Sequence, residues 1–145
     1  MDGITFRIYI TDSDWLKYNP RLYFYRYKMI EINTTFFPYQ LVLYRKQPIE
    51  LRLKIKNSGT EKVLVSYKMQ LPSELSFDKS GFSAIHEEKL GELAPAQTAE
   101  QRFEIHPRPL TREGSVEIAI KATEHYNSYE FTMREYKKKV ALVIG

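Results

Sequence analysis

Aromatic and basic side chains alternate near the start of this chain in a pattern that suits ligand binding. Twelve of the twenty aromatic residues fall within residues 1–44. Such rings can stack on nucleic-acid bases while Arg and Lys hold phosphates, form a platform for sugar faces, or anchor a protein interface. Alternatively, the tyrosines form a cross-strand ladder that packs over an open face of the fold. The candidate binding residues are Trp15, Tyr18, Tyr23, Tyr25, Arg26, Tyr27 and Lys28.

Residues suited to metal or acid–base chemistry are scattered. The three histidines His86, His106 and His125 are far apart and show no metal-ligand spacing. Asp12 and Asp14 resemble the start of a calcium loop, but its glycine turn and distal glutamate are missing, so turn or cap chemistry is favoured. We therefore expect no catalytic residue, no metal site and no cofactor. A hydrolase whose site is assembled across strands remains an alternative.

Composition narrows the class of protein. The 145 residues are 43% hydrophobic and 28% charged, which is ordinary for one globular domain. The absence of cysteine excludes disulfides, thiol nucleophiles and cysteine-based zinc sites. The net charge of +4 is spread along the chain, and the single basic run, Lys137-Lys138-Lys139, is expected to precede a strand or to guard a sheet edge.

Targeting signals are not evident in the sequence. The N-terminus lacks the basic and apolar regions of a signal peptide, and no segment has the roughly 20 apolar residues of a membrane helix. We expect a cytoplasmic protein if the chain is full length, and an extracellular one if it is a fragment of a larger surface protein.

The clearest structural pattern lies at residues 49–59. Four aliphatic residues alternate there with charged ones, which predicts a strand with one buried and one solvated face. Asn57-Ser58-Gly59 then predicts a tight reversal with Gly59 at positive φ. A second alternating run follows, so the two together indicate a β-hairpin.

Similar runs recur along the chain between prolines and turn residues, with no helical period over three turns. This spacing predicts an all-β, immunoglobulin-like sandwich of two antiparallel sheets. Its seven strands are expected near Gln40–Tyr44, Ile49–Lys56, Val63–Gln70, Phe82–Leu90, Ala99–Ile105, Ser115–Thr123 and Lys138–Ile144.

The first 35 residues are expected to form an aromatic-rich β extension of that sandwich. Strands are predicted at residues 4–10 and 22–32, with a loop signal at Asn33-Thr34-Thr35. The strand at 22–32 is long and nearly free of acid, so it should pair with the edge of the sandwich or with the same strand of a second copy. A homodimer is slightly favoured.

The order of features from about residue 36 to the end resembles the CARDB-type immunoglobulin-like modules of archaeal and bacterial proteins. The resemblance rests on Asn57-Ser58-Gly59, on Leu71-Pro72 after a strand, on the run Leu90–Thr98, and on Gly114 opening a strand. It implies an accessory or adhesion module without catalytic residues, acting on another protein or on a second copy of itself. Nucleic-acid or carbohydrate binding through the N-terminal extension is the alternative.

Overall fold

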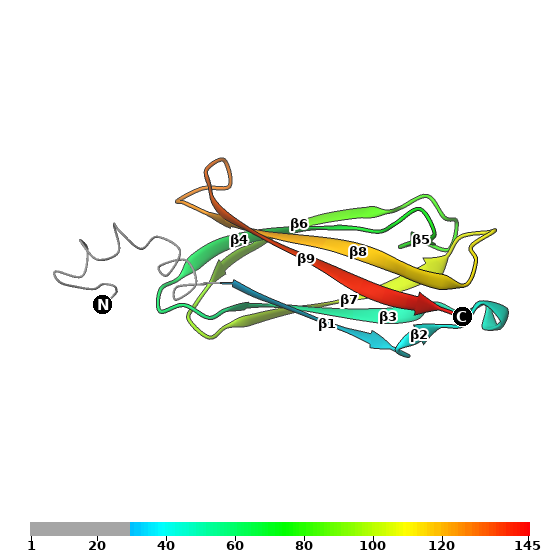
Figure 1. Ribbon diagram of the computed structural model, residues 1–145. Helices are drawn as coiled ribbons and strands as arrows, with labels where there is room; N and C mark the ends of the chain where they lie inside the picture. The colour runs from blue at the N-terminus through cyan, green and yellow to red at the C-terminus, as the bar shows by residue number, and fades with distance from the viewer. Residues whose placement is uncertain (1–29) are drawn as a thin grey trace, which may run out of the picture.

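Two β-sheets face one another in the computed structural model, which describes residues 30–145 (Figure 1). The four-stranded sheet has the order β1-β3-β7-β5, and the five-stranded sheet has the order β2-β9-β8-β4-β6. The predicted all-β, two-sheet sandwich is therefore confirmed. The elements are β1 (Ile30–Phe37), β2 (Gln40–Leu41), the short 3-10 helix η1 (Leu43–Arg45), β3 (Ile49–Asn57), β4 (Val63–Gln70), β5 (Leu75–Ser76), β6 (Ile85–Leu93), β7 (Thr98–Pro107), β8 (Gly114–His125) and β9 (Thr132–Ile144).

The core lies between the sheets and is built from the aliphatic rows that the alternation predicts. On β3 these are Ile49, Leu51, Leu53 and Ile55, all buried, while the charged residues between them face outward. The inner faces of β4, β8 and β9 complete the core with residues such as Met69, Ile118 and Leu142. Because side chains alternate across a strand, each sheet also presents a polar outer face.

Most strands agree with the predictions, but β9 begins at Thr132 and not at Lys138, so Lys137-Lys138-Lys139 lies within this strand and not before it. β4 has the predicted bounds, whereas β6 begins at Ile85 and not at Phe82. The Asp78 carboxylate accepts the backbone N–H groups of Phe82 and Ser83, which holds these residues in a turn. These hydrogen bonds and that of Ser80, the strongest contributor, lower the pKa of Asp78.

The first predicted strand of the sandwich was wrong in length and in direction of pairing. Only Gln40 and Leu41 form β2, which pairs parallel with β9. The chain then turns into η1, and Lys46, the residue that follows it, has a positive φ of 52°. The two-residue strand β5 was not predicted, since a strand that short leaves no alternation to detect.

The expected loop at Asn33-Thr34-Thr35 was also wrong, because these residues lie inside β1 and pair with β3. The threonines are β-branched and suit a strand, so they outweigh the turn preference of Asn33. The domain boundary placed between residues 35 and 36 falls within the same strand. Residues 30–35 pair with residues 52–57, and β1 forms one edge of the four-stranded sheet.

The predicted β-hairpin of residues 49–70 was wrong, because β3 pairs with β1 and β7 while β4 pairs with β6 and β8 in the other sheet. The turn after β3 therefore passes from one sheet to the other, and it is made by the side chain of Asn57 and not by a glycine. Gly59 does not have the predicted positive φ. Instead the buried Asn57 amide donates to the carbonyl oxygens of Glu61 and Leu93 at 2.7 and 2.9 Å, and its Oδ1 accepts the Gly59 N–H at 2.9 Å. An asparagine side chain that bonds two residues ahead mimics a turn of the main chain, so glycine is not needed here.

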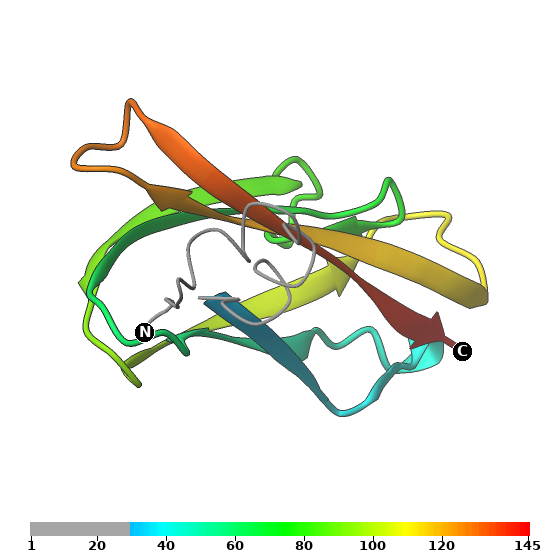
Figure 2. The same ribbon diagram turned by 60° about the vertical axis from the view of Figure 1, so that its left-hand side comes forward.

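β1 and β9 lie on the same side of the molecule, one in each layer, as Figures 1 and 2 show. Both are at the edge of their sheet for most of their length. Lys138 of β9 crosses between the layers, and its Nζ donates to the carbonyl oxygen of Ile32 at 2.9 Å.

Candidate functional site

The seven aromatic and basic residues predicted to bind a ligand lie outside the described residues. They are Trp15, Tyr18, Tyr23, Tyr25, Arg26, Tyr27 and Lys28. Asp12, Asp14 and the expected strand at 22–32 also fall wholly or mostly in that part of the chain. These interpretations therefore stay predictions, and the candidate surfaces below come from residues 30–145.

The three histidines lie in separate places, each beside a different partner. His86 contacts Glu88 at 3.1 Å, and His106 contacts Glu104 at 3.3 Å. His125 Nε2 lies 2.7 Å from the Ser66 hydroxyl. Within residues 30–145, no three His, Asp or Glu side chains gather in a group that could hold a metal ion.

A polar and aromatic cluster fills the space between β6 and β7. The Glu88 carboxylate accepts hydrogen bonds from Tyr67 Oη at 3.3 Å and from Gln101 Nε2 at 3.1 Å. The His86 ring packs edge-on against Phe103, with 5.0 Å between centroids. Burial, followed by the charge of Glu88, raises the pKa of Tyr67, so its hydroxyl keeps its proton and donates to Glu88. The cluster joins the two sheets through contacts that are all within the chain.

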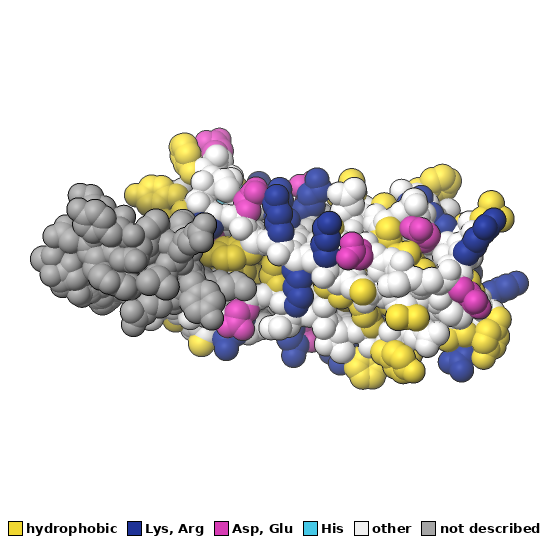
Figure 3. All heavy atoms as spheres, viewed as in Figure 1, with side chains coloured by type: hydrophobic (Ala, Val, Ile, Leu, Met, Phe, Trp, Pro, Cys, Tyr) yellow, Lys and Arg dark blue, Asp and Glu magenta, His cyan; other side chains and the backbone are white. Residues whose placement is uncertain are grey.

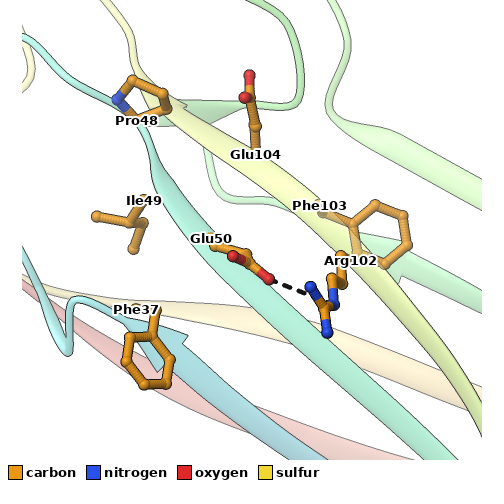
Figure 4. Close-up of a pocket in the computed structure, with 7 residues that line it drawn as sticks. All are labelled: Phe37, Pro48, Ile49, Glu50, Arg102, Phe103 and Glu104. Atoms are coloured by element: carbon orange, nitrogen blue, oxygen red, sulfur yellow. Dashed lines mark ion pairs between the residues drawn. The ribbon is translucent and has the colours of Figure 1, made fainter.

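A shallow hollow of about 340 Å³ lies at the four-stranded sheet (Figure 4). Its charges are matched. Glu50 Oε2 lies 2.9 Å from Arg52 Nε and 3.6 Å from Arg102 Nε, and the Arg52 guanidinium lies over the Phe37 ring. The hollow is lined by Phe37, Pro48, Ile49, Glu50, Arg102, Phe103 and Glu104.

The β8–β9 hairpin projects from one end of the sandwich and carries exposed apolar side chains (Figures 1 and 3). Tyr126 and Phe131 are each 59% exposed, and Met133 is 51% exposed. We call these three residues the aromatic tip. Large apolar side chains gathered on one projecting turn are typical of contact surfaces.

The backbone of the aromatic tip is held by its own hydrogen bonds. The Tyr126 N–H donates to the carbonyl oxygen of Phe131 at 2.9 Å, and the Ser128 N–H donates to that of Tyr126 at 2.7 Å. Asn127 has a positive φ of 64°, which asparagine tolerates. Tyr129 braces the turn against β6, because its hydroxyl accepts the Gly91 N–H at 2.8 Å. The tip is therefore ordered before any partner arrives.

A row of lysines crosses the outer face of the five-stranded sheet. Lys68 of β4 is opposite Lys121 of β8, which in turn is opposite Lys137 of β9. Lys121 pairs with Glu135 at 3.5 Å, whereas Lys68 and Lys137 make no ion pair within residues 30–145. Basic side chains are visible across this part of the surface in Figure 3. Like charges directly opposite one another lower the stability of a sheet, so the row has a cost.

Sequence reasoning missed both of these surfaces. The turn residues Tyr126-Asn127-Ser128 could have indicated a hairpin, because the alternating runs before and after them are clear. The lysine row has no signal in the sequence alone, since its members come from three strands that are far apart along the chain.

Comparisons with known proteins do not place the chain in a family. No family model matches it, and no curated protein matches its sequence. Among solved structures it is similar to the alkylpurine DNA glycosylase AlkC of Pseudomonas fluorescens bound to DNA containing an abasic site analogue. That match has 14% identity and a TM-score of 0.40, and it covers 80% of this chain but only 30% of the glycosylase.

Two other solved structures match over most of their own length. BslA, a bacterial hydrophobin, has 10% identity and a TM-score of 0.47, with 81% of this chain and 95% of that chain covered. A Bordetella pertussis protein assigned as ApaA has 15% identity and a TM-score of 0.41, with 79% and 91% covered. At these identities and TM-scores, none of the three likenesses carries an argument about what this chain does.

Proposed function

We propose that the chain is a non-catalytic binding or assembly module that acts through protein–protein contacts, with the aromatic tip as an anchor. The observation that carries this proposal is the pre-ordered hairpin turn with Tyr126, Phe131 and Met133 exposed. A rigid turn loses little conformational entropy on binding, so more of the contact energy is left for affinity. Aromatic anchors that fill a partner's pocket commonly dominate an interface.

The strand order supports an immunoglobulin-like assignment as part of this proposal. The order β1-β3-β7 corresponds to the A-B-E strands of that fold, and β9-β8-β4-β6 corresponds to G-F-C-C′. A relation to CARDB-type modules belongs to the same proposal, because it rests on the sequence features alone. Among residues 30–145 there is no helix with the length and hydrophobicity needed to cross a lipid bilayer.

Two alternative functions would need different kinds of site. Nucleic-acid or carbohydrate binding through residues 15–28 stays a prediction. A hydrolase would need titratable groups beside a substrate site. Within residues 30–145 the closest such pairs are His125 with the Ser66 hydroxyl at 2.7 Å and His86 with Glu88 at 3.1 Å, and none of these four residues lines the hollow at the four-stranded sheet. His86 and Glu88 are also engaged with neighbouring groups in the cluster between β6 and β7.

Site-specific photo-crosslinking tests the proposed anchor. A benzophenone amino acid is placed at Phe131 in one chain and at Tyr44 in another, since Tyr44 is 78% exposed in η1 at the opposite end of the sandwich. The probe at position 131 should crosslink to a discrete protein in a lysate of the source cells, or to a second copy of the chain.

Competition makes the result specific. Excess unlabelled chain should abolish the crosslink, and excess chain carrying Tyr126→Ser and Phe131→Ser should not. Equal products from the two probe positions, or no product at position 131, would show that the aromatic tip is not the anchor.

A further inference from the structure

Among the strands of residues 30–145, one edge of β9 is open along most of its length. The strand pairs with β8 from Thr132 to Ile144. On its other side it pairs only with β2, at Val143 and Ile144, when the pairings within residues 30–145 are considered. Eleven positions, 132–142, therefore present an unpaired side there. An open edge of this length can take another strand.

The hydrogen bonds to β2 identify which backbone groups point to that edge. The Gly145 N–H donates to the carbonyl oxygen of Leu41 at 2.8 Å, and the Leu43 N–H donates to that of Gly145 at 2.9 Å. Backbone groups alternate in direction along a strand, so those of Lys137, Lys139 and Ala141 point the same way as those of Gly145. The open edge thus offers donors and acceptors at every second residue.

The side chains in the middle of this edge are basic, between Glu135 and Ala141. Lys137 and Lys139 are exposed on the outer face, and neither makes an ion pair within residues 30–145. Lys121 and Lys68 continue the positive charge behind Lys137 in direct register. An additional strand on β9 would place its own outer side chains about 5 Å from these lysines.

The neighbouring Lys138 has a different role. Its ammonium group reaches the carbonyl oxygen of Ile32 and covers an unpaired acceptor on the edge of β1. Lysines at a sheet edge are a common protection against pairing between copies of one chain. Here the protection is selective, because the charges that repel another basic strand attract an acidic one.

We propose that the open edge of β9 binds an acidic, extended segment of a partner protein as an additional strand. Carboxylates at alternate positions of that segment pair with Lys137 and Lys139, while its backbone bonds to the free groups of β9. The segment's residue between these carboxylates is opposite Lys138, and its next inward-facing residue lies beside half-buried Val140, where an apolar, β-branched side chain fits. This inference rests on the proposed function, since it specifies one kind of protein contact.

The test uses a capped seven-residue peptide that alternates glutamate and valine, with binding to the full chain followed by fluorescence anisotropy. Binding should be saturable and should weaken as salt rises. Lys137→Glu combined with Lys139→Glu should weaken it by at least about tenfold. The matched control carries Lys54→Glu and Lys56→Glu, which reverse two charges on the outer face of β3. It makes the same change in net charge and should alter affinity by less than about twofold.

Two further changes separate strand pairing from simple charge attraction. Ala141→Pro removes a donor that points to the open edge and spares the ladder with β8, so it should weaken binding by about tenfold without unfolding the sheet. N-methylation of alternate peptide residues should have a similar effect on the peptide side. Circular dichroism and melting curves confirm that each variant is folded.

The outcomes are distinct. Equal binding of an N-methylated peptide, or of oligothymidylate with the same charge, would show that the lysines attract any polyanion, and the strand proposal would be overturned. Absence of peptide binding would overturn it too, while the crosslink at Phe131 would still support the proposed function. Peptide binding with no crosslink at Phe131 would support the acidic-strand site and would show that the aromatic tip is not the anchor.

Discussion

The outer faces of the two sheets carry similar residue types but arrange their charges differently. On the four-stranded sheet the register also puts Arg52 opposite Arg102 and Glu50 opposite Glu104, but Glu50 contacts both arginines. On the same face Lys54 is opposite Glu100. On the five-stranded sheet Lys121 is opposite both Lys68 and Lys137. Lys68 is also opposite Glu87 of β6, and Lys121 pairs with Glu135. Each strand by itself alternates apolar and charged residues in the same manner. The difference therefore arises from strand order and register and not from the composition of any strand.

This difference changes the meaning of the net charge of +4. Along the sequence the positive charge is evenly spread, as predicted. In space three of the lysines form a row on the outer face of the five-stranded sheet, bordered by Glu87 and Glu135. Net charge thus says little about partners until the register of the sheet is known.

The largest expected effect concerns the core beneath the four-stranded sheet. Leu53 is fully buried on the inner side of β3. Leu53→Ala should lower the free energy of unfolding by about 2–5 kcal/mol, because it removes buried methyl groups and leaves a cavity. Urea denaturation measures this value. The outward-facing neighbour, changed as Lys54→Ala, should lose less than about 0.5 kcal/mol. A similar loss of unfolding free energy in both variants would mean that Leu53 does not lie on the buried face of β3.

The second effect concerns the link between the sheets. Asn57 ends β3 in one sheet, and its amide donates to the carbonyl oxygen of Leu93 in the other. Asn57→Ala leaves buried backbone groups without partners and should cost about 1–3 kcal/mol. Exposed Ser58→Ala serves as the control in the same denaturation experiment. If Asn57→Ala is as stable as the intact chain, the turn is held by the main chain alone.

The third effect appears at high pH and concerns Tyr67 of β4, in the five-stranded sheet. The pKa of Tyr67 is raised in the folded chain, so above pH 10 the unfolded chain loses this proton while the folded chain keeps it. Stability should therefore fall above about pH 10, by up to about 1.4 kcal/mol per pH unit from this one group. Tyr67→Phe should have a shallower decline than the intact chain, whereas exposed Tyr44→Phe should keep the full slope. Parallel curves for Tyr67→Phe and the intact chain would contradict the account.

The smallest effect compares the two outer faces directly. Lys137→Gln removes one member of a like-charged row, so it should raise stability by about 0.2–1 kcal/mol. Arg52→Gln removes a partner of Glu50 and should lower stability by a similar amount. Both differences in stability should become smaller as salt is added, because salt screens exposed charges. Thermal melts at low and high salt provide the measurement, and shifts of the same sign in both variants would remove the distinction between the faces.

The sequence predicted the class of fold because alternation is a local signal. Residues 63–70 became β4 with the predicted bounds, and the inner rows of β3 and β8 are the apolar rows expected. Turn chemistry was less reliable. Asn57 and Gly59 both suit a reversal, and the sequence did not show that the buried amide of Asn57 would carry it.

The candidate surfaces depended on information that is not local. The free side of β9 follows from its neighbours in the sheet, and those are set by pairings with strands far away in sequence. The same reason applies to Lys138. It stands in a run of three lysines, yet its side chain crosses to the other sheet while Lys137 and Lys139 remain on the outer face. Alternation indicates that neighbours point apart, but it does not identify what each one meets.

The parallel pairing of β2 with β9 has a mechanical consequence. The two strands run in the same direction, and Gly145 is bonded to Leu41 and Leu43. Tension applied through the segment before β2 and through Gly145 pulls these strands in opposite directions along their length. The two hydrogen bonds are then stretched together instead of opening one after the other. A pull along the chain therefore loads this short pair in shear, together with the β1–β3 ladder that precedes it.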